Sequence, residues 1–278
     1  MRAFSFAGGK LPPGEKTYLM GILNVTPDSF SDGMKYLDPA SALAHAKKLQ
    51  ADGADILDVG ACSTRPFGER ASEEEELRRL KSVLPALKNE LDIPISVDTY
   101  RPEVARYALE TGAGIINDVS GGFSSEMAAL IKEYGAGLIV MHAGDEKTEA
   151  VRRYPDGVLA DVQRVLDGLC DRYLSAGVKP EQLCLDPGFG FAKTAEQNTE
   201  LLQTLSQLDT RGHALLIGLS RKRFIASLSE EADKERLFGT LAADLFAQQS
   251  GADILRVHDV KAHLPAVLAM DRLIGRKS

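Results

Sequence analysis

The chain has 278 residues, of which 44% are hydrophobic and 26% are charged, as is typical of a folded globular protein with a substantial core. Its net charge of −7 and its pI near 5.4 argue against a general surface for nucleic acid or for anionic membranes. No apolar run approaches the roughly 20 residues of a membrane span, residues 1–17 carry no clear secretory signal, and the three cysteines suggest neither disulfides nor zinc, so we expect a cytoplasmic protein.

Eight short apolar runs predict buried β-strands. In chain order they cover residues 18–23, 55–60, 94–99, 114–118, 137–142, 183–188, 214–220 and 253–259. The segments between them have apolar residues at three- and four-residue spacing, which predicts amphipathic helices, for example over 38–54, 72–91 and 158–177. This alternation predicts a parallel sheet covered by helices.

The number of repeats favours one architecture over another. Strands and helices that alternate eight times over this length predict an α/β fold closed into a single-domain (β/α)8 barrel, the TIM-barrel architecture, with a doubly wound open sheet as the competing arrangement. No linker rich in Pro, Gly or Ser divides the chain. We therefore expect an N-terminal extension over residues 1–17 and one barrel domain over residues 18–278.

Polar side chains stand at nearly every predicted strand end. They are Asn24, Ser63, Thr64, Arg65, Asp98, Asn117, Asp118, His142, Asp186, Ser220, Arg221, Lys222, Arg256 and His258. In a closed barrel the carboxyl ends of the strands converge on one cavity, whereas an open sheet would spread them apart. Residues 24–36 and 143–157 follow strands and are expected to be long loops that carry function.

Taken singly, these residues have ordinary structural explanations. Asp98 and Asp186 would cap helices, and Asn117 would adopt a left-handed turn conformation. Arg221 and Lys222 would lie on a solvated face, and His258 would be a hydrogen-bonded residue at the rim. Their recurrence at successive strand ends favours a shared site instead.

The chemistry of the set divides into two halves. Two carboxylates, an amide and an ammonium would suit a flat heterocycle with donor and acceptor edges, and they come from Asp98, Asp186, Asn117 and Lys222. A phosphate or diphosphate would suit Asn24, Arg65, Arg256 and His258. The run DPGFGF at 186–191 adds a tight turn and two aromatic rings. The predicted ligand is a planar heterocycle that bears an anionic group.

Eight segments resemble, in order and spacing, the signature segments of the dihydropteroate synthase family over about residues 18–275. They are GILNVTPDSFSDGM, STRP, SVDT, INDVSGG, MH, LDPGFGF, GLSRK and RVHDVK. The resemblance implies a (β/α)8 barrel and a transferase of folate biosynthesis that condenses 6-hydroxymethyl-7,8-dihydropterin diphosphate with p-aminobenzoate, releasing diphosphate. It also implies Mg²⁺ as cofactor and a homodimer.

The resemblance assigns roles to particular residues. The pterin would be held by Asp98, Asn117, Asp186 and Lys222, with Met141, Phe191 and Gly218 lining its slot. The diphosphate would be bound by Thr64, Arg65, Arg256, His258 and Asn24, and Asn24 would be the protein ligand of Mg²⁺. The p-aminobenzoate would contact Phe30, Pro66, Ser220 and Arg221. The catalytic set would be Asp28, Lys222 and Arg256, with no protein nucleophile in a dissociative substitution.

The chain departs from the family pattern in three places. Cys62 stands where the family usually has glutamate, Phe67 follows the proline where glycine is common, and Ala143 replaces a methionine. These departures leave open a pterin-binding paralogue without synthase turnover. A pterin-dependent methyltransferase fits less well, because it would not require the Arg65 and Arg256 pair. We expect Cys62 to be a small packing residue, since the reaction offers no role for a thiol nucleophile.

Overall fold

The structure, a computed structural model, describes residues 3–12, 14–25, 39–62, 71–143, 154–229 and 236–277. Eight parallel strands close into a barrel in the order β10-β3-β4-β5-β6-β7-β8-β9. They are β3 (Tyr18–Asn24), β4 (Ile56–Gly60), β5 (Ile95–Asp98), β6 (Ile115–Asp118), β7 (Gly137–Met141), β8 (Leu183–Asp186), β9 (Ala214–Ile217) and β10 (Ile254–Val257). Each predicted strand is present, and the closed barrel excludes the open sheet.

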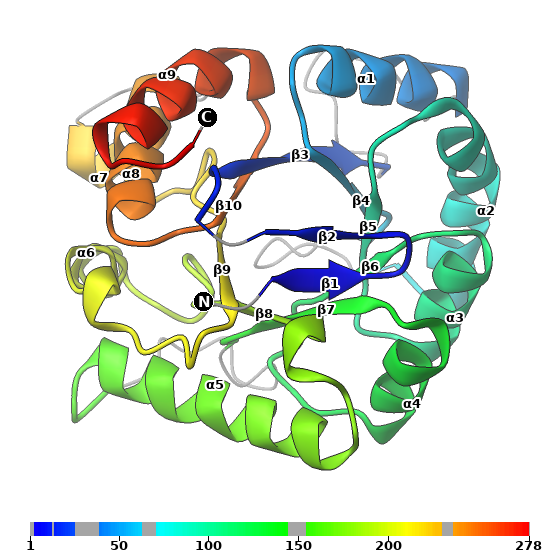
Figure 1. The fold of residues 1–278 in the computed structure, drawn as a ribbon, viewed down its shortest axis with the longest axis horizontal. Coiled ribbons are helices and arrows are strands. Elements are labelled where there is room, and N and C mark those ends of the chain that lie inside the picture. The colour runs from blue at the N-terminus through cyan, green and yellow to red at the C-terminus, as the bar shows by residue number, and fades with distance from the viewer. Residues whose placement is uncertain are drawn as a thin grey trace.

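Helices surround the barrel as an outer ring (Figure 1). They are α1 (Pro39–Ala51), α2 (Glu73–Glu90), α3 (Pro102–Glu110), α4 (Ser125–Tyr134), α5 (Val158–Ser175), α6 (Ala195–Gln203), α7 (Ile225–Ser229), α8 (Leu237–Gln249) and α9 (Val260–Leu273), with short 3-10 turns η1 (Pro180–Gln182) and η2 (Leu205–Gln207). The three helices named from the sequence are found within a few residues of their predicted ends. Among the described residues, no helix combines the length and apolar character that a bilayer span requires.

The helix starts show why these segments are helical. Ser72 caps α2, where its side chain accepts a hydrogen bond from the Glu75 amide at 3.2 Å, and four glutamates in the first turn favour the positive end of the helix dipole. Thr194 caps α6 in a reciprocal arrangement with the Gln197 side chain.

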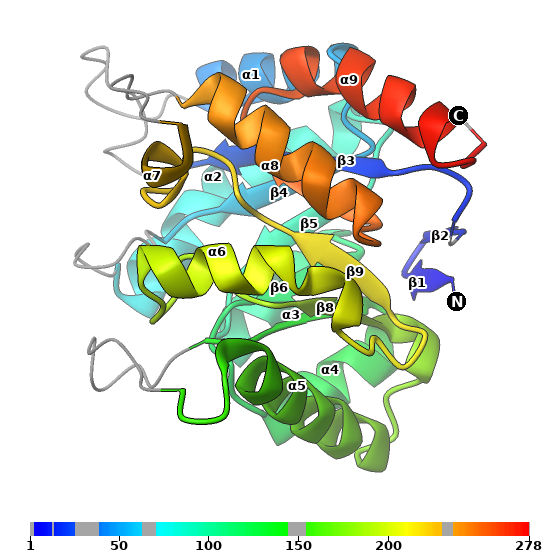
Figure 2. The same cartoon turned by 90° about the vertical axis from the view of Figure 1, so that its left-hand side faces the viewer.

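An N-terminal hairpin, which the sequence pattern did not reveal, covers the end of the barrel where the strands begin. It pairs β1 (Phe4–Phe6) with β2 (Gly9–Leu11) in antiparallel fashion. Phe4 and Phe6 pack on apolar side chains inside this end of the barrel, which we call the lower barrel, among them Met20 and Ile254. Figure 2 shows the hairpin at that end of the molecule. The division between an extension over 1–17 and a barrel over 18–278 stays a prediction.

Candidate active site

The alternation of side chains along the strands places charged residues inside the barrel, in the half nearer the carboxyl ends of the strands. Ile56 on β4 and Ile254 on β10 belong to the apolar cluster inside the lower barrel. Side chains two residues further along a strand face the same side. Asp58 and Arg256 therefore point into the barrel one layer above the isoleucines.

Arg256 is the centre of this layer. Its Nε donates to Oδ2 of Asp58 at 2.6 Å, and its Nη2 donates to Oδ2 of Asp98 at 3.3 Å. Asn117 on β6 donates from Nδ2 to the same Asp58 oxygen at 3.2 Å. Four strands, β4, β5, β6 and β10, thus contribute to one hydrogen-bonded group. Asp58 was absent from the residues chosen by sequence, because it lies inside a strand rather than at its end.

Several oxygens of this group have no hydrogen-bond partner among the described residues. They are Oδ1 of Asp58, Oδ1 of Asp98 and Oδ1 of Asn117. A buried acceptor without a partner costs about 1–3 kcal/mol, so these oxygens suit a ligand that brings N–H donors. Burial raises the pKa of Asp98, and the Arg256 guanidinium opposes that rise. The neighbouring carboxylate of Asp58 raises it further.

A second charged pair, Asp186 and Lys222, lies next to this group. Asp186 ends β8 and accepts a hydrogen bond from the Gly188 amide at 2.7 Å. Lys222 follows β9, donates to the Phe189 carbonyl, and places Nζ 5.0 Å from the centre of the Phe191 ring. Burial lowers the pKa of Lys222 to about 8, although the Asp186 carboxylate acts in the opposite direction. Burial also raises the pKa of Asp186.

At the end of β10, His258 meets the segment that follows β9. Its Nδ1 lies 2.9 Å from Oγ of Ser220, and its backbone amide donates to the same oxygen at 3.2 Å. Arg221 forms a two-point ion pair with Asp259, with contacts of 2.7 Å and 3.0 Å. These residues form a partly exposed rim beside the buried layer.

Three further predicted residues border the same space. Met141 is buried at the end of β7, in register with Asp186. Asn24 ends β3, and a Cβ on Gly60 would lie 3.3 Å from its Oδ1. A Cβ on Gly218 would meet Arg256 only at ordinary contact distance, 3.8 Å, so the glycine leaves room beside the guanidinium.

Several of the ordinary structural explanations for single polar residues do not hold. Asp98 bonds Arg256 instead of capping α3, whose cap position is Arg101 without a side-chain hydrogen bond. Asn117 lies within β6, and it is not among the described residues with positive φ. Lys222 is partly buried and donates to a backbone carbonyl. Asp186 also acts as an ordinary turn acceptor, and His258 and Arg221 occupy the hydrogen-bonded, partly exposed rim positions that the ordinary explanations describe.

Five predicted site residues lie outside the described part of the chain. They are Asp28, Phe30, Thr64, Arg65 and Pro66. Their places and roles stay predictions.

No group of three or more His, Cys, Asp or Glu side chains within the described ranges could hold a metal ion. Mg²⁺ commonly keeps water and substrate phosphate oxygens in its coordination shell and takes only one or two protein ligands. A single amide oxygen, such as that of Asn24, therefore fits a Mg²⁺ ion that arrives with a diphosphate.

Cys62, which stands where the family usually has a glutamate, is buried. It is 8% exposed, and burial raises the pKa of its thiol. A thiol with a raised pKa is a poor nucleophile at neutral pH, because the thiolate is the reactive form.

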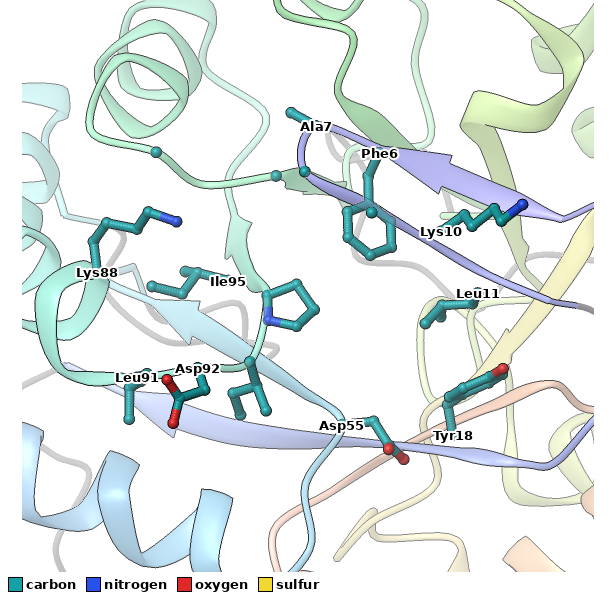
Figure 3. A pocket seen from close by; sticks show the side chains of 16 residues that line it. Phe6, Ala7, Lys10, Leu11, Tyr18, Asp55, Lys88, Leu91, Asp92 and Ile95 are labelled. Atoms are coloured by element: carbon teal, nitrogen blue, oxygen red, sulfur yellow. The ribbon is translucent and has the colours of Figure 1, made fainter. Parts of the chain in front are cut away.

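The opposite end of the barrel contains a cavity of about 320 Å³ (Figure 3). It lies between the hairpin and the segment from α2 to β5, with Lys10 on one side and Lys88 on the other. Its lining includes none of the buried charged residues described above. The carboxyl-end layer therefore remains the candidate active site.

Comparisons with known proteins show the family of the chain. The chain matches the family model described as "Pterin binding enzyme" over residues 20–258. A dihydropteroate synthase of Synechocystis sp. is 47% identical over 253 residues, which is 90% of this chain and 87% of the relative.

Solved structures are similar over nearly the whole chain. The Xanthomonas albilineans dihydropteroate synthase with 4-aminobenzoic acid has a TM-score of 0.90 at 39% identity and covers 98% of both chains. The structure of that enzyme in complex with 7,8-dihydropteroate has a TM-score of 0.86 at 39% identity, covering 97% of this chain and 98% of the other.

Proposed function

The chain belongs to the dihydropteroate synthase family of pterin-binding enzymes, and we propose that it condenses 6-hydroxymethyl-7,8-dihydropterin diphosphate with p-aminobenzoate. The products are 7,8-dihydropteroate and diphosphate. The observation that carries the proposal is the buried layer around Arg256, with carboxylate and amide oxygens that lack partners among the described residues. A ligand with several N–H groups and an anionic tail matches that layer.

The pterin is assigned to the buried layer. Asp98 and Asn117 offer acceptor oxygens to ring and amino N–H groups, and Asp186 offers a carboxylate from the adjacent side. Lys222 supplies an ammonium donor for an electronegative ring atom. Phe191 contributes an aromatic face near that ammonium, and Met141 and Gly218 border the slot.

The diphosphate is assigned to the cationic side of the site. Arg256 and His258, with Thr64 and Arg65, would bind its oxygens, and Asn24 would be the protein ligand of Mg²⁺. When bound, Mg²⁺ supplies positive charge that stabilises the leaving diphosphate. Arg256 meets the same need from the protein, because its guanidinium is held in place by Asp58 before substrate arrives.

The reaction we propose is a dissociative substitution. The bond between the pterin methylene carbon and the diphosphate oxygen breaks, and the bonding electrons leave with the diphosphate. The aniline nitrogen of p-aminobenzoate then attacks the methylene carbon and loses a proton. Ser220 and Arg221, with Phe30 and Pro66, would receive the p-aminobenzoate, and Asp28 would complete the catalytic set with Lys222 and Arg256.

One experiment separates this function from the alternatives. Purified protein is incubated with the dihydropterin diphosphate, Mg²⁺ and varied p-aminobenzoate, and both diphosphate and dihydropteroate are measured. A synthase releases the two products in equal amounts, dependent on p-aminobenzoate. A binding-only paralogue binds the pterin and releases nothing, and a pterin-dependent methyltransferase uses no diphosphate. Either of those outcomes overturns the proposal.

A homodimer in the cytoplasm is also proposed. Phe238 and Phe246 on α8 are 74% and 44% exposed, and Leu273 on α9 is 81% exposed. Helices α8 and α9 pack against each other, so these apolar side chains lie on neighbouring elements. Exposed apolar side chains on two adjacent helices favour a protein partner, and a second copy of the chain is the proposed one.

A further inference from the structure

A buried lysine lies beneath the turn that follows β8. Lys193 is 8% exposed, and its Nζ contacts three backbone carbonyls of that turn. The distances are 2.8 Å to Gly188, 3.0 Å to Pro187 and 3.3 Å to Phe191. A buried ammonium is costly without hydrogen-bond acceptors, so the charge of Lys193 requires the backbone to keep these carbonyls in place. Removing the ammonium would leave these carbonyls without the positive charge that they contact.

The same ammonium is linked to the end of the neighbouring strand. Its Nζ lies 2.9 Å from Nδ1 of His142, the fully buried residue that follows β7. An ammonium can only donate, so Nδ1 is the acceptor and the ring proton is on Nε2, which lies 3.1 Å from Asp161 on α5. The turn is therefore held to both β7 and α5 through Lys193.

Two lysines share the carbonyls of residues 187–191. Lys193 donates to the carbonyls of Pro187, Gly188 and Phe191. Lys222, on the side of the candidate site, donates to the carbonyl of Phe189. The direction of the Phe189 carbonyl depends on the carbonyls on either side of it. The position of the Lys222 ammonium is consequently coupled to Lys193, although the two lysines have different surroundings.

The turn also has no room for a side chain at Gly188. Gly188 has φ of +68°, and a Cβ there would lie 1.9 Å from the His142 carbonyl oxygen. On the outer side, the Gly190 amide donates to Asn198 at 2.7 Å. The Lys193 ammonium is therefore one of several contacts that hold the backbone between Asp186 and Phe191.

We propose that Lys193 is a positioning residue for the pterin, which fixes the 187–191 backbone so that Asp186, Phe191 and Lys222 face the ligand together. The inference rests on the proposed function, because it assumes that these three residues contact the pterin. Lys193 itself would touch neither substrate.

The test compares Lys193→Met with the wild-type enzyme. Direct titration with the dihydropterin diphosphate is expected to show binding weakened by about tenfold or more, since several contacts shift together. At saturating dihydropterin diphosphate, the KM for p-aminobenzoate is expected to change by less than about twofold, because that substrate is assigned to another part of the site. Lys193→Arg, which keeps a buried cation with several donors, is expected to recover part of the affinity.

Arg276→Met is the matched control. Arg276 is another cation with a largely buried side chain that donates to a carbonyl, that of Ala252 at 2.8 Å, and it also donates to Thr17 at 2.7 Å. Both partners belong to the end of the barrel where the strands begin. This control is expected to lower the melting temperature while pterin binding stays unchanged.

The outcomes are distinguishable. A Lys193→Met enzyme that loses thermal stability but binds the dihydropterin diphosphate as tightly as wild type overturns the inference. If Lys193→Met does not fold, Lys193→Gln is titrated instead, because its shorter, uncharged side chain does not reach the position of the ammonium among the three carbonyls. Binding weakened less than about threefold in that variant contradicts the inference. Failure of the wild-type chain to bind the dihydropterin diphosphate overturns the proposed function itself.

Discussion

The Nε atom of Arg256 lies 2.6 Å from Oδ2 of Asp58, a carboxylate 198 residues earlier in the chain. Asp58 is fully buried and also accepts from Asn117. It therefore orients one residue assigned to the diphosphate and one assigned to the pterin. Arg256 also donates from Nη2 to Asp98 at 3.3 Å, which is a second contact between the two assignments.

Asp58→Asn is expected to damage both stability and activity. Removing one member of a buried ion pair leaves Arg256 with less compensation and costs about 3–5 kcal/mol of unfolding free energy. The kcat/KM for synthesis is expected to fall by about tenfold or more. Thermal melts and initial rates measure the two effects. Glu90→Gln, which breaks an exposed pair with Lys47, is the control and should change neither.

Binding of the dihydropterin diphosphate is expected to weaken as pH rises through about 8, the pKa to which burial lowers Lys222. Above that pH the ammonium loses the proton that it donates to the ligand. Asp186 opposes the lowering of the pKa, and Arg256 adds to it. Calorimetric titration across this range measures the change, and Lys222→Met should remove it. An equally steep decline in Lys222→Met would assign the pH dependence to another group.

The lowered pKa of Lys222 also predicts how the stability of the free protein changes with pH, and this change is opposite in direction to the change in binding. The folded-state pKa of Lys222 lies below its ordinary value of 10.5, so the unfolded chain holds this proton more tightly. Between about pH 8 and pH 10.5 the Lys222 contribution to stability is therefore expected to rise with pH. Denaturant unfolding of wild type and Lys222→Met over that range isolates this contribution.

Gly188→Ala is expected to weaken pterin binding and to lower stability by more than about 1 kcal/mol. The new Cβ would overlap the His142 carbonyl oxygen at a position with φ of +68°. Gly135→Ala provides the control, since Gly135 has φ of +62° but nothing within 4 Å of an added Cβ. The difference between the two variants isolates the steric conflict from the cost of positive φ. Equal losses in both would show that the turn can move aside.

Cys62→Ser is expected to retain synthase activity within about twofold, because a buried thiol with a raised pKa supplies no nucleophile. A small loss of stability is expected, since the serine hydroxyl is more costly to bury than the thiol. Initial rates and thermal melts measure the two effects. A loss of turnover by a hundredfold in folded protein would give Cys62 a chemical role after all.

Phe238→Glu is expected to shift the protein from dimer to monomer in sedimentation velocity, because a charge would be placed on the proposed apolar contact surface. Gln207→Glu adds a charge at an exposed position on η2 and should leave the dimer intact. A wild-type monomer at all accessible concentrations would contradict the proposed dimer.

Much of the barrel could be predicted because its signal is local. Each strand is a short apolar run, as in residues 137–142, and each run is followed by a segment of helical period. Eight such alternations in one chain without a linker favour closure. Residues 4–11 escaped prediction because two three-residue strands carry too little periodicity to stand out.

The polar strand ends indicated the general location of the site for the same local reason. Asp98, Asn117, Asp186 and Arg256 stand at or near the ends of apolar runs, and a barrel gathers such ends. Asp58 and Lys193 were missed. Asp58 is one acidic residue inside an apolar strand, and Lys193 follows a turn whose backbone direction no spacing rule specifies.

The sequence by itself therefore determined the eight strands, the closed barrel and the rim on which the polar residues meet, because hydrophobic periodicity is a property of neighbouring residues. Only the tertiary structure decided which charges pair. The contact between Arg256 and Asp58 depends on strand register around the closed barrel, and the contacts of Lys193 depend on carbonyl directions in one turn. Strand register is set by packing between residues that are distant in the chain. The carbonyl directions are set by a backbone geometry that many sequences share.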